Sequence, residues 1–246
     1  MSSSSSRPNV AAARRCGSHA VLLGLSMALL SACQSIQQPA TQQAAAQALP
    51  PLPVPGSMHY VVQAAQSDVR FLVYRDGPLG FLGHNHVIQA KELSGDIYVA
   101  PEFAQSGFEL KLPVDGFKID AADARAVEGT DFTKQPSDDD IAETREHMLG
   151  PDALDATRFP EIHIRSVGLT GTAPSAQLVV RVDFHGVTRD MTVPVQIEQQ
   201  GDQISVAGEL QIDQNDFSVK PFSFLGGAIR VADVVKVRFK IAGTKA

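Results

Sequence analysis

The sequence predicts an all-β domain in which short antiparallel strands close into a barrel or sandwich, with one α-helix between them. Apolar residues recur at every second position in many segments between residues 60 and 241. Turn-forming residues separate these segments, as at residues 76–78, 185–186 and 200–202. So many strands with apolar residues on one face only favour a closed structure, because open sheet edges promote aggregation.

The composition agrees with a globular body. The chain has 246 residues, of which 43% are hydrophobic and 20% charged, which argues against wholesale disorder. Its formal net charge of -6 weighs against a nucleic-acid-binding protein, which usually carries a concentrated basic patch. No apolar run reaches the ~18 residues that a membrane-spanning helix needs.

The first 32 residues have the pattern of a secretory signal. Three arginines precede an apolar stretch at residues 20–30, which is too short to span a bilayer. Residues 30–33, Leu-Ser-Ala-Cys, resemble the cleavage site of bacterial lipoproteins, in which the new N-terminal cysteine is acylated with chains such as palmitate. Gln34 then favours the outer membrane by the same resemblance. The alternative is plain secretion, with Cys33 an incidental thiol.

Cleavage before Cys33 would divide the chain into three parts: a signal peptide (1–32), a tether (33–57) and a folded domain (58–246). The tether is rich in Gln, Ala and Pro and cannot bury a core. Loss of three arginines leaves 18 basic against 27 acidic residues, a formal charge of -9. We therefore expect a periplasmic protein that is held to the membrane through lipidated Cys33 and binds no nucleic acid.

Eight to ten strands are expected in the domain. They correspond to residues 61–63, 69–73, 84–89, 96–99, 108–114, 162–165, 178–184, 193–197, 204–212 and 235–241. Polar residues occupy most of the other parity, so the apolar set should face inward. Periodicity leaves open whether side chains fill the interior or line a cavity for an apolar ligand.

One helix is expected at residues 138–149. Ser137 is a suitable N-cap, and Asp140 three residues later makes a variant of the capping box. Gly150 follows as a C-terminal stop signal. We expect this capped helix to pack across one end of the barrel. The three aspartates at 138–140 lack the spacing of a calcium loop, and helix capping explains them better.

Several segments, in the right order, resemble the YceI-like family of secreted lipid-binding proteins. They are Arg145, residues 147–149, 154–156, 159–162, 184–189, 193–195, 212–218, and Asp233 with the alternating residues that follow it. The resemblance covers the chain from Met58 to Ala246. It implies a lipocalin-like antiparallel barrel that holds a long isoprenoid chain, or a related lipid, in an apolar tunnel. The chain departs from the common family pattern at residues 79–86.

His84 and His86 are the most suggestive polar pair. Two residues apart on a strand, they would face the same side, where neutral imidazoles can bind zinc, copper or haem iron. A third ligand would have to come from elsewhere, with His147, His163 and His185 as candidates. The alternative is that His84 and His86 form hydrogen bonds at the barrel mouth or contact a lipid headgroup.

No enzyme motif is present. The domain has no cysteine, no Gly-x-Ser-x-Gly elbow and no His-Glu-x-x-His zinc motif. Residues 222–227 form a glycine-containing apolar segment that suits a lid over a hydrophobic pocket. We therefore expect a binding protein that needs no cofactor.

The leading hypothesis is a lipoprotein whose barrel binds a long apolar ligand. The expected wall residues are Phe71, Val73, Phe108, Leu110, Leu178, Val180, Val182, Phe184, Val235, Val237 and Phe239. His84, His86 and Arg145 are the expected headgroup contacts. The alternatives are a metal- or haem-linked redox accessory protein that uses His84 and His86, and a ligand-free structural module of the envelope. A homodimer is compatible with the sequence.

Overall fold

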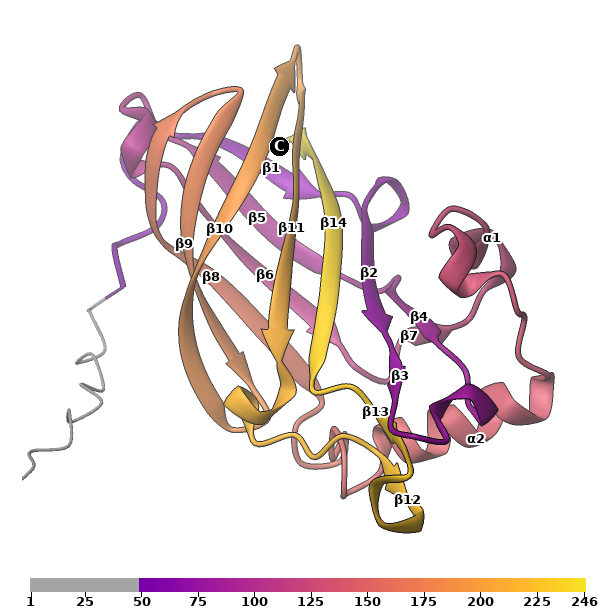
Figure 1. The fold of residues 1–246 in the computed structure, drawn as a ribbon. Coiled ribbons are helices and arrows are strands. Elements are labelled where there is room, and N and C mark those ends of the chain that lie inside the picture. Colours follow the sequence, from indigo (N-terminus) through magenta and orange to yellow (C-terminus); the bar gives the residue numbers. More distant parts are fainter. Residues whose placement is uncertain (1–48) are drawn as a thin grey trace, which may run out of the picture. The chain divides into compact units, whose positions relative to one another are not determined.

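The computed structural model describes residues 49–246 (Figure 1). Within this range no helix is long and apolar enough to cross a membrane. Cys33, the predicted signal peptide and the first part of the predicted tether lie outside the described residues. Their assignment therefore stays a prediction.

The described residues contain fourteen strands and two α-helices. The strands are β1 (Met58–Val62), β2 (Asp68–Val73), β3 (Arg75–Asp76), β4 (His86–Ala90), β5 (Ser94–Val99), β6 (Gly107–Pro113), β7 (Phe117–Ile119), β8 (Glu161–Thr172), β9 (Ser175–Phe184), β10 (Val187–Gln200), β11 (Gln203–Asp213), β12 (Ser223–Phe224), β13 (Ile229–Val231) and β14 (Val234–Lys245). The helices are α1 (Ala122–Ala126) and α2 (Asp138–Leu149).

Eight strands close into an antiparallel barrel, which confirms the predicted fold class. Their order is β1-β5-β6-β8-β9-β10-β11-β14, and β14 returns to β1. Strands β2, β4 and β7 continue the sheet from β14 as a branch. A second, three-stranded sheet joins β12, β13 and β3. In Figure 1, this small sheet and α2 lie near the same end of the barrel, opposite the C-terminus.

Strand β14 has two partners in succession on one of its edges. Residues 236–240 pair with β2, and residues 243–245 pair with β1. Its other edge pairs with β11 along nearly the whole strand. The wall therefore divides at β14, and the branch β2-β4-β7 extends it toward α2 (Figure 1). We call the end of the barrel that contains α2 the wide end.

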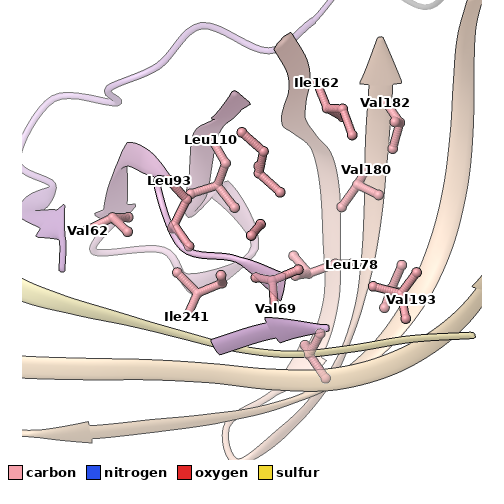
Figure 2. Close-up of a cluster of buried hydrophobic side chains, with 14 of the residues drawn as sticks. Val62, Val69, Leu93, Leu110, Ile162, Leu178, Val180, Val182, Val193 and Ile241 are labelled. Atoms are coloured by element: carbon pink, nitrogen blue, oxygen red, sulfur yellow. The ribbon is translucent and has the colours of Figure 1, made fainter. Parts of the chain in front are cut away.

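Alternate apolar residues of the barrel strands face the interior, as the period of two predicts. Figure 2 labels buried residues of this interior from β1, β6, β8, β9, β10 and β14, together with Val69 of β2 and Leu93 of the β4–β5 turn. Val180 and Val193 are 6% and 3% exposed, so these positions are removed almost completely from solvent. Burial of such side chains is the main source of stability in a domain without a disulfide.

The structure corrects the prediction of a single helix. α1, five residues long, and the Phe132 side chain cover the outer face of β2 and β4. Leu72, which alternates with the inward residues of β2, is consequently only 1% exposed in a second apolar cluster.

Ion pairs hold the segment that follows α1 in place. The buried Glu128 carboxylate accepts hydrogen bonds from Arg70 and Arg238 on the outer face of β2 and β14.

The strand count also exceeds the predicted eight to ten. Strands β3, β7, β12 and β13 each have only two or three residues, too few to show a period. The others correspond to predicted segments, although β8 and β10 extend well beyond them. The prediction that His84 and His86 share a strand is wrong, because β4 begins at His86.

The predicted helix is confirmed as α2, with the predicted cap. The Ser137 Oγ accepts a hydrogen bond from the Asp140 N–H at 3.2 Å, and the Asp140 carboxylate accepts one from the Ser137 N–H at 3.0 Å. Ile141, Met148 and Leu149 pack partly buried against the barrel core. The helix therefore covers the wide end, as expected.

The last residues of the predicted tether contact the barrel. Arg165 on β8 donates a hydrogen bond to the Pro50 carbonyl at 2.9 Å. The Leu52 side chain packs over Gly107, where a Cβ atom would come within 2.9 Å of it. Residues 50–52 are thus bound to the outside of β6 and β8.

We predict that Ser137→Ala lowers the free energy of unfolding by about 1 kcal/mol, because the first turn of α2 loses its cap. The measurement is urea denaturation of the purified chain. Ser94→Ala is the matched control, since Ser94 is exposed and its hydroxyl has no hydrogen bond within the described residues. Equal stability of the two variants would contradict the role of the cap.

Candidate functional site

A cavity of about 510 Å3 lies in the barrel interior. Its deep part is lined by residues such as Ile97 and Ile241, and its other end by residues of α2. Leu82 and Phe222, which are 59% and 41% exposed, also line it, so the cavity reaches the surface at the wide end. Its volume lies within the roughly 300–1,000 Å3 of small-molecule sites.

The predicted wall residues line this cavity. They are Phe71, Val73, Phe108, Leu110, Leu178, Val180, Val182, Phe184, Val235, Val237 and Phe239. The ring of Phe239, one of these residues, lies across Gly208, where a Cβ atom would come within 2.7 Å of the ring. The strands thus enclose a cavity in place of a fully filled core.

Arg145, expected at the headgroup, does not line the cavity. Its guanidinium donates hydrogen bonds to the carbonyls of Phe117 and Asp115, the first at 2.6 Å. It therefore attaches α2 to the β6–β7 turn. This is a correction to the expected role, and its reason is that both terminal nitrogens of the Arg145 guanidinium donate to backbone carbonyls outside the cavity.

Polar side chains gather only where the cavity meets the surface. They are Arg75, His84, His86, Asp140, Glu143, Thr144, His147, Gln214, Lys220 and Arg230. Arg75 donates to the carbonyls of Phe81 and Gly83, and Arg230 pairs with Asp76 at 2.5 Å. The cavity therefore has an apolar barrel and a polar mouth, the arrangement that suits an amphipathic ligand.

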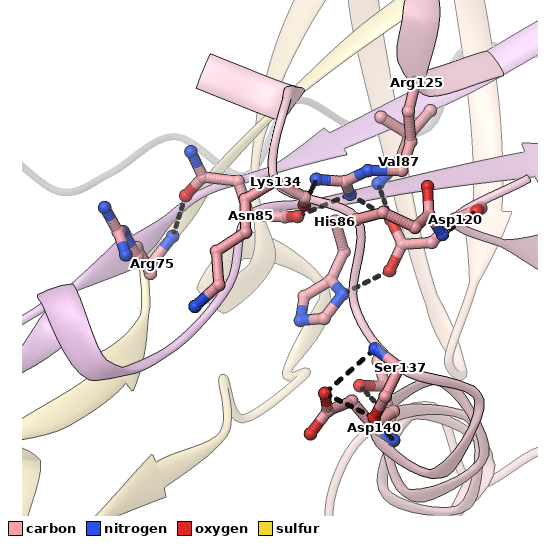
Figure 3. Close-up of polar contacts among 11 residues, drawn as sticks. Arg75, Asn85, His86, Val87, Asp120, Arg125, Lys134, Ser137 and Asp140 are labelled. Carbon is pink, nitrogen blue, oxygen red and sulfur yellow. Dashed lines mark hydrogen bonds and ion pairs between the residues drawn. The ribbon is translucent and has the colours of Figure 1, made fainter. Parts of the chain in front are cut away.

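His86 is held at the mouth by a buried hydrogen-bond network (Figure 3). Its Nδ1 lies 2.6 Å from the Asp120 Oδ2. The Asp120 Oδ1 accepts hydrogen bonds from the Val87 N–H at 2.8 Å and from Arg125 at 2.5 Å. Arg125 also donates to the carbonyls of Asn85 and Lys134. Asp120 and Arg125 are only 1% and 3% exposed, so the network is shielded from water.

These contacts determine the charge of Asp120. Burial by itself would raise the pKa of this carboxyl. The hydrogen bonds from His86, Val87 and Arg125 outweigh burial and lower the pKa. Asp120 is therefore an ionised carboxylate whose charge is balanced by Arg125.

His84 precedes β4 and lies beside His86, with 6.2 Å between the ring centroids. Burial lowers the pKa of His84, and the positive charge of Lys134 lowers it further, against a smaller opposing effect of Asp140. The neutral imidazole is thus favoured at this position. Both histidines line the cavity, as the sequence predicted, although only His86 belongs to the strand.

The candidate third metal ligands are dispersed. His147 lines the cavity, whereas His163 interacts with Glu161 at 3.0 Å and His185 with the Phe217 carbonyl at 3.0 Å. Residues 49–246 hold no group of three or more His, Cys, Asp or Glu side chains placed for a metal ion. The geometry therefore does not favour the metal- or haem-linked hypothesis.

The segment predicted as a lid lies at the mouth. Phe222 lines the cavity and stacks on His147 of α2, with 4.9 Å between ring centroids and 18° between ring planes. Phe224 and Leu225 are 55% and 61% exposed. The stack connects the loop to α2 across the cavity entrance.

Asp120 and Arg125 were not expected as site residues. Asp120 lies 34 positions from His86, and no periodicity relates an acid after one strand to a histidine on another. Their meeting depends on the pairing of β4 with β7, which places Asp120 one residue beyond Ile119 and opposite Val87. Nothing in the sequence around Asp120 indicates that this carboxylate is buried, because the neighbouring residues are typical of a turn.

Comparison with known proteins identifies a family. The family model of the YceI-like domain matches residues 60–242. No protein among those with curated functions matches the chain.

Two solved structures share the fold. BcnA from Burkholderia cenocepacia is 20% identical, with a TM-score of 0.55, over 74% of this chain and 99% of BcnA. A polyisoprenoid binding domain from Saccharophagus degradans, implicated in plant cell wall breakdown, is 13% identical, with a TM-score of 0.53, over 77% of this chain and 99% of that domain. At these identities the likeness concerns the fold alone.

We predict that Asp120→Asn lowers the free energy of unfolding by about 3–5 kcal/mol at neutral pH, because it leaves Arg125 buried without its counter-charge. Since the folded pKa of Asp120 is lowered, its contribution is complete above the ordinary carboxyl pKa and is lost as the pH falls through the folded value. The stability difference between wild type and variant should therefore be constant above about pH 5 and shrink below about pH 4.

Urea denaturation across this pH range provides the measurement. Asp123→Asn, on the exposed face of α1, is the matched control and should change stability little. A difference between wild type and Asp120→Asn that stays unchanged down to about pH 2 would contradict an ionised Asp120.

Proposed function

The chain belongs to the YceI-like family, and from the form of its cavity we propose that it binds one long apolar chain inside the barrel, with the polar head of that chain at the wide end. The solved domain from Saccharophagus degradans is named as polyisoprenoid-binding. An isoprenoid or a related lipid is accordingly the ligand class that we propose here. The chain acts by binding, without catalysis.

The observation that carries this proposal is the distribution of polarity along the cavity. Its interior is lined by aliphatic and aromatic side chains from the barrel strands, while its charged and imidazole groups lie at the mouth. An apolar tail is thus matched to the interior and a polar head to the mouth.

Burial supplies enough free energy for such a ligand. At ~25 cal/mol per Å2, a chain that buries ~400 Å2 of apolar surface gains ~10 kcal/mol before the costs of ordering and of lost translation. Shape and burial therefore suffice for affinity, and the mouth residues are left to discriminate among heads.

We further propose that this binding takes place in the periplasm, with the chain anchored by lipidated Cys33, preferably in the outer membrane. The lipoprotein-like residues 30–33 and Gln34 support this location. Two acyl chains or more on one cysteine give stable anchoring, whereas a single chain gives only marginal binding. The barrel would then receive its ligand close to a membrane.

We predict that Val180→Phe removes most of the lipid that co-purifies with the protein, because the larger side chain projects into the cavity from β9. The measurement is organic extraction and mass spectrometry of protein purified from a bacterial periplasm, with the thermal midpoint recorded in parallel. Lipid content should fall about tenfold while the midpoint changes by only a few degrees.

Val179→Phe is the matched control, since Val179 directly precedes Val180 on the same strand and does not line the cavity. It should retain lipid at the wild-type level. A wild type that contains no lipid and binds no added isoprenoid would favour the ligand-free structural module instead.

We predict that Cys33→Ser moves the protein from the membrane fraction to the soluble periplasmic fraction, because no acyl chain can then be attached. Cell fractionation and immunoblotting measure the distribution. Ser31→Ala, which keeps a small residue in the cleavage site, should leave the protein in the membrane fraction. Membrane association that persists in Cys33→Ser would exclude this anchor.

A further inference from the structure

The His86–Asp120 hydrogen bond determines which nitrogen of the imidazole carries a proton. The Asp120 carboxylate is buried and receives hydrogen bonds from Val87, Arg125 and His86. A carboxylate surrounded by donors is ionised and can only accept. The proton between the two side chains therefore belongs to His86 Nδ1.

The opposite ring nitrogen follows from this. A neutral imidazole has one N–H, so a proton on Nδ1 makes Nε2 an acceptor with a free lone pair. None of the described residues donates a hydrogen bond to His86 Nε2, and the side chain is 13% exposed. Figure 3 shows this nitrogen on the ring edge turned away from Asp120.

His86 lines the same cavity as the apolar wall residues. In the pairing of β2 with β4 it is opposite Val73, which also lines the cavity. A ligand that fills the mouth displaces water from Nε2. If the ligand head offers no hydrogen-bond donor, Nε2 is left without a hydrogen bond. The loss of this hydrogen bond costs binding free energy where water is excluded.

We propose that His86 Nε2 accepts a hydrogen bond from a hydroxyl group on the head of the bound lipid. The site thereby selects apolar chains with a hydroxyl-bearing head over chains whose heads only accept, such as ethers, esters and ketones. This inference rests on the proposed function, because it assigns the head chemistry of the same ligand. Asp120 and Arg125 act as positioning residues that set the tautomer of His86.

A matched pair of probes tests the inference. Farnesol and farnesyl methyl ether have the same isoprenoid chain, but only farnesol can donate a hydrogen bond. The lipid-stripped protein is incubated with an equimolar mixture of the two compounds at about pH 8. After gel filtration, the retained compounds are extracted and quantified by gas chromatography and mass spectrometry.

We expect the wild type to retain farnesol over the ether by about tenfold. His86→Phe keeps the ring volume and should retain the two in about equal amounts. His163→Phe is the control, because His163 on β8 interacts with Glu161 and does not line the cavity, and it should keep the wild-type ratio. Equal retention by the wild type, or an unchanged ratio in His86→Phe, overturns the inference.

A second measurement does not depend on the fold of a variant. Nitrogen-15 NMR of histidine-labelled wild-type protein at the same pH distinguishes a protonated Nδ1 from a protonated Nε2. We expect His86 to show the Nδ1–H tautomer, because the Asp120 carboxylate accepts its hydrogen bond. A wild-type His86 with the proton on Nε2 contradicts the inference.

The two probes also separate the two levels of the proposal. If the wild type retains neither compound, apolar ligand binding itself fails, and the inference with it. If it retains both equally, the barrel binds the chain and only the selection by His86 is wrong.

Discussion

The cavity depends on how β14 is paired. One edge of β14 bonds first to β2 and then to β1, so the sheet closes into eight strands at one end and continues through β2, β4 and β7 at the other. A barrel of eight strands pairing along their full length has an interior that side chains can fill. At that second end β2 and β4 contribute to the cavity wall, and α2 and the loops line the entrance.

The polar groups at and behind the mouth differ in how far water reaches them. Asp120 and Arg125 are almost completely buried and neutralise each other, and they hold His86 without adding net charge to an apolar cavity. Lys220 and Arg230 are exposed to water. Selection among lipid headgroups therefore depends on His86, whose side chain is already fixed and loses little conformational entropy when a ligand binds.

Local patterns predicted much of this structure, and the misses have physical causes. Val180 and Phe239 could be placed on the cavity wall because alternation on a strand fixes which face a residue occupies. Ser137 could be recognised because a helix cap is a contact between near neighbours. Leu72 has the parity of an outward residue, and only the packing of α1 buries it. The contact between His86 and Asp120 depends on strand pairing, which no local pattern encodes.

The helix α2 contributes no fully buried residue, in contrast to every long strand of the barrel. Free energies of local opening follow the amount of apolar surface that an element buries. Amide hydrogens of α2 should therefore exchange with solvent sooner than those of β9 or β14. Detachment of this one helix uncovers the entrance while all eight barrel strands stay paired, so a long ligand can enter by a fluctuation much smaller than global unfolding.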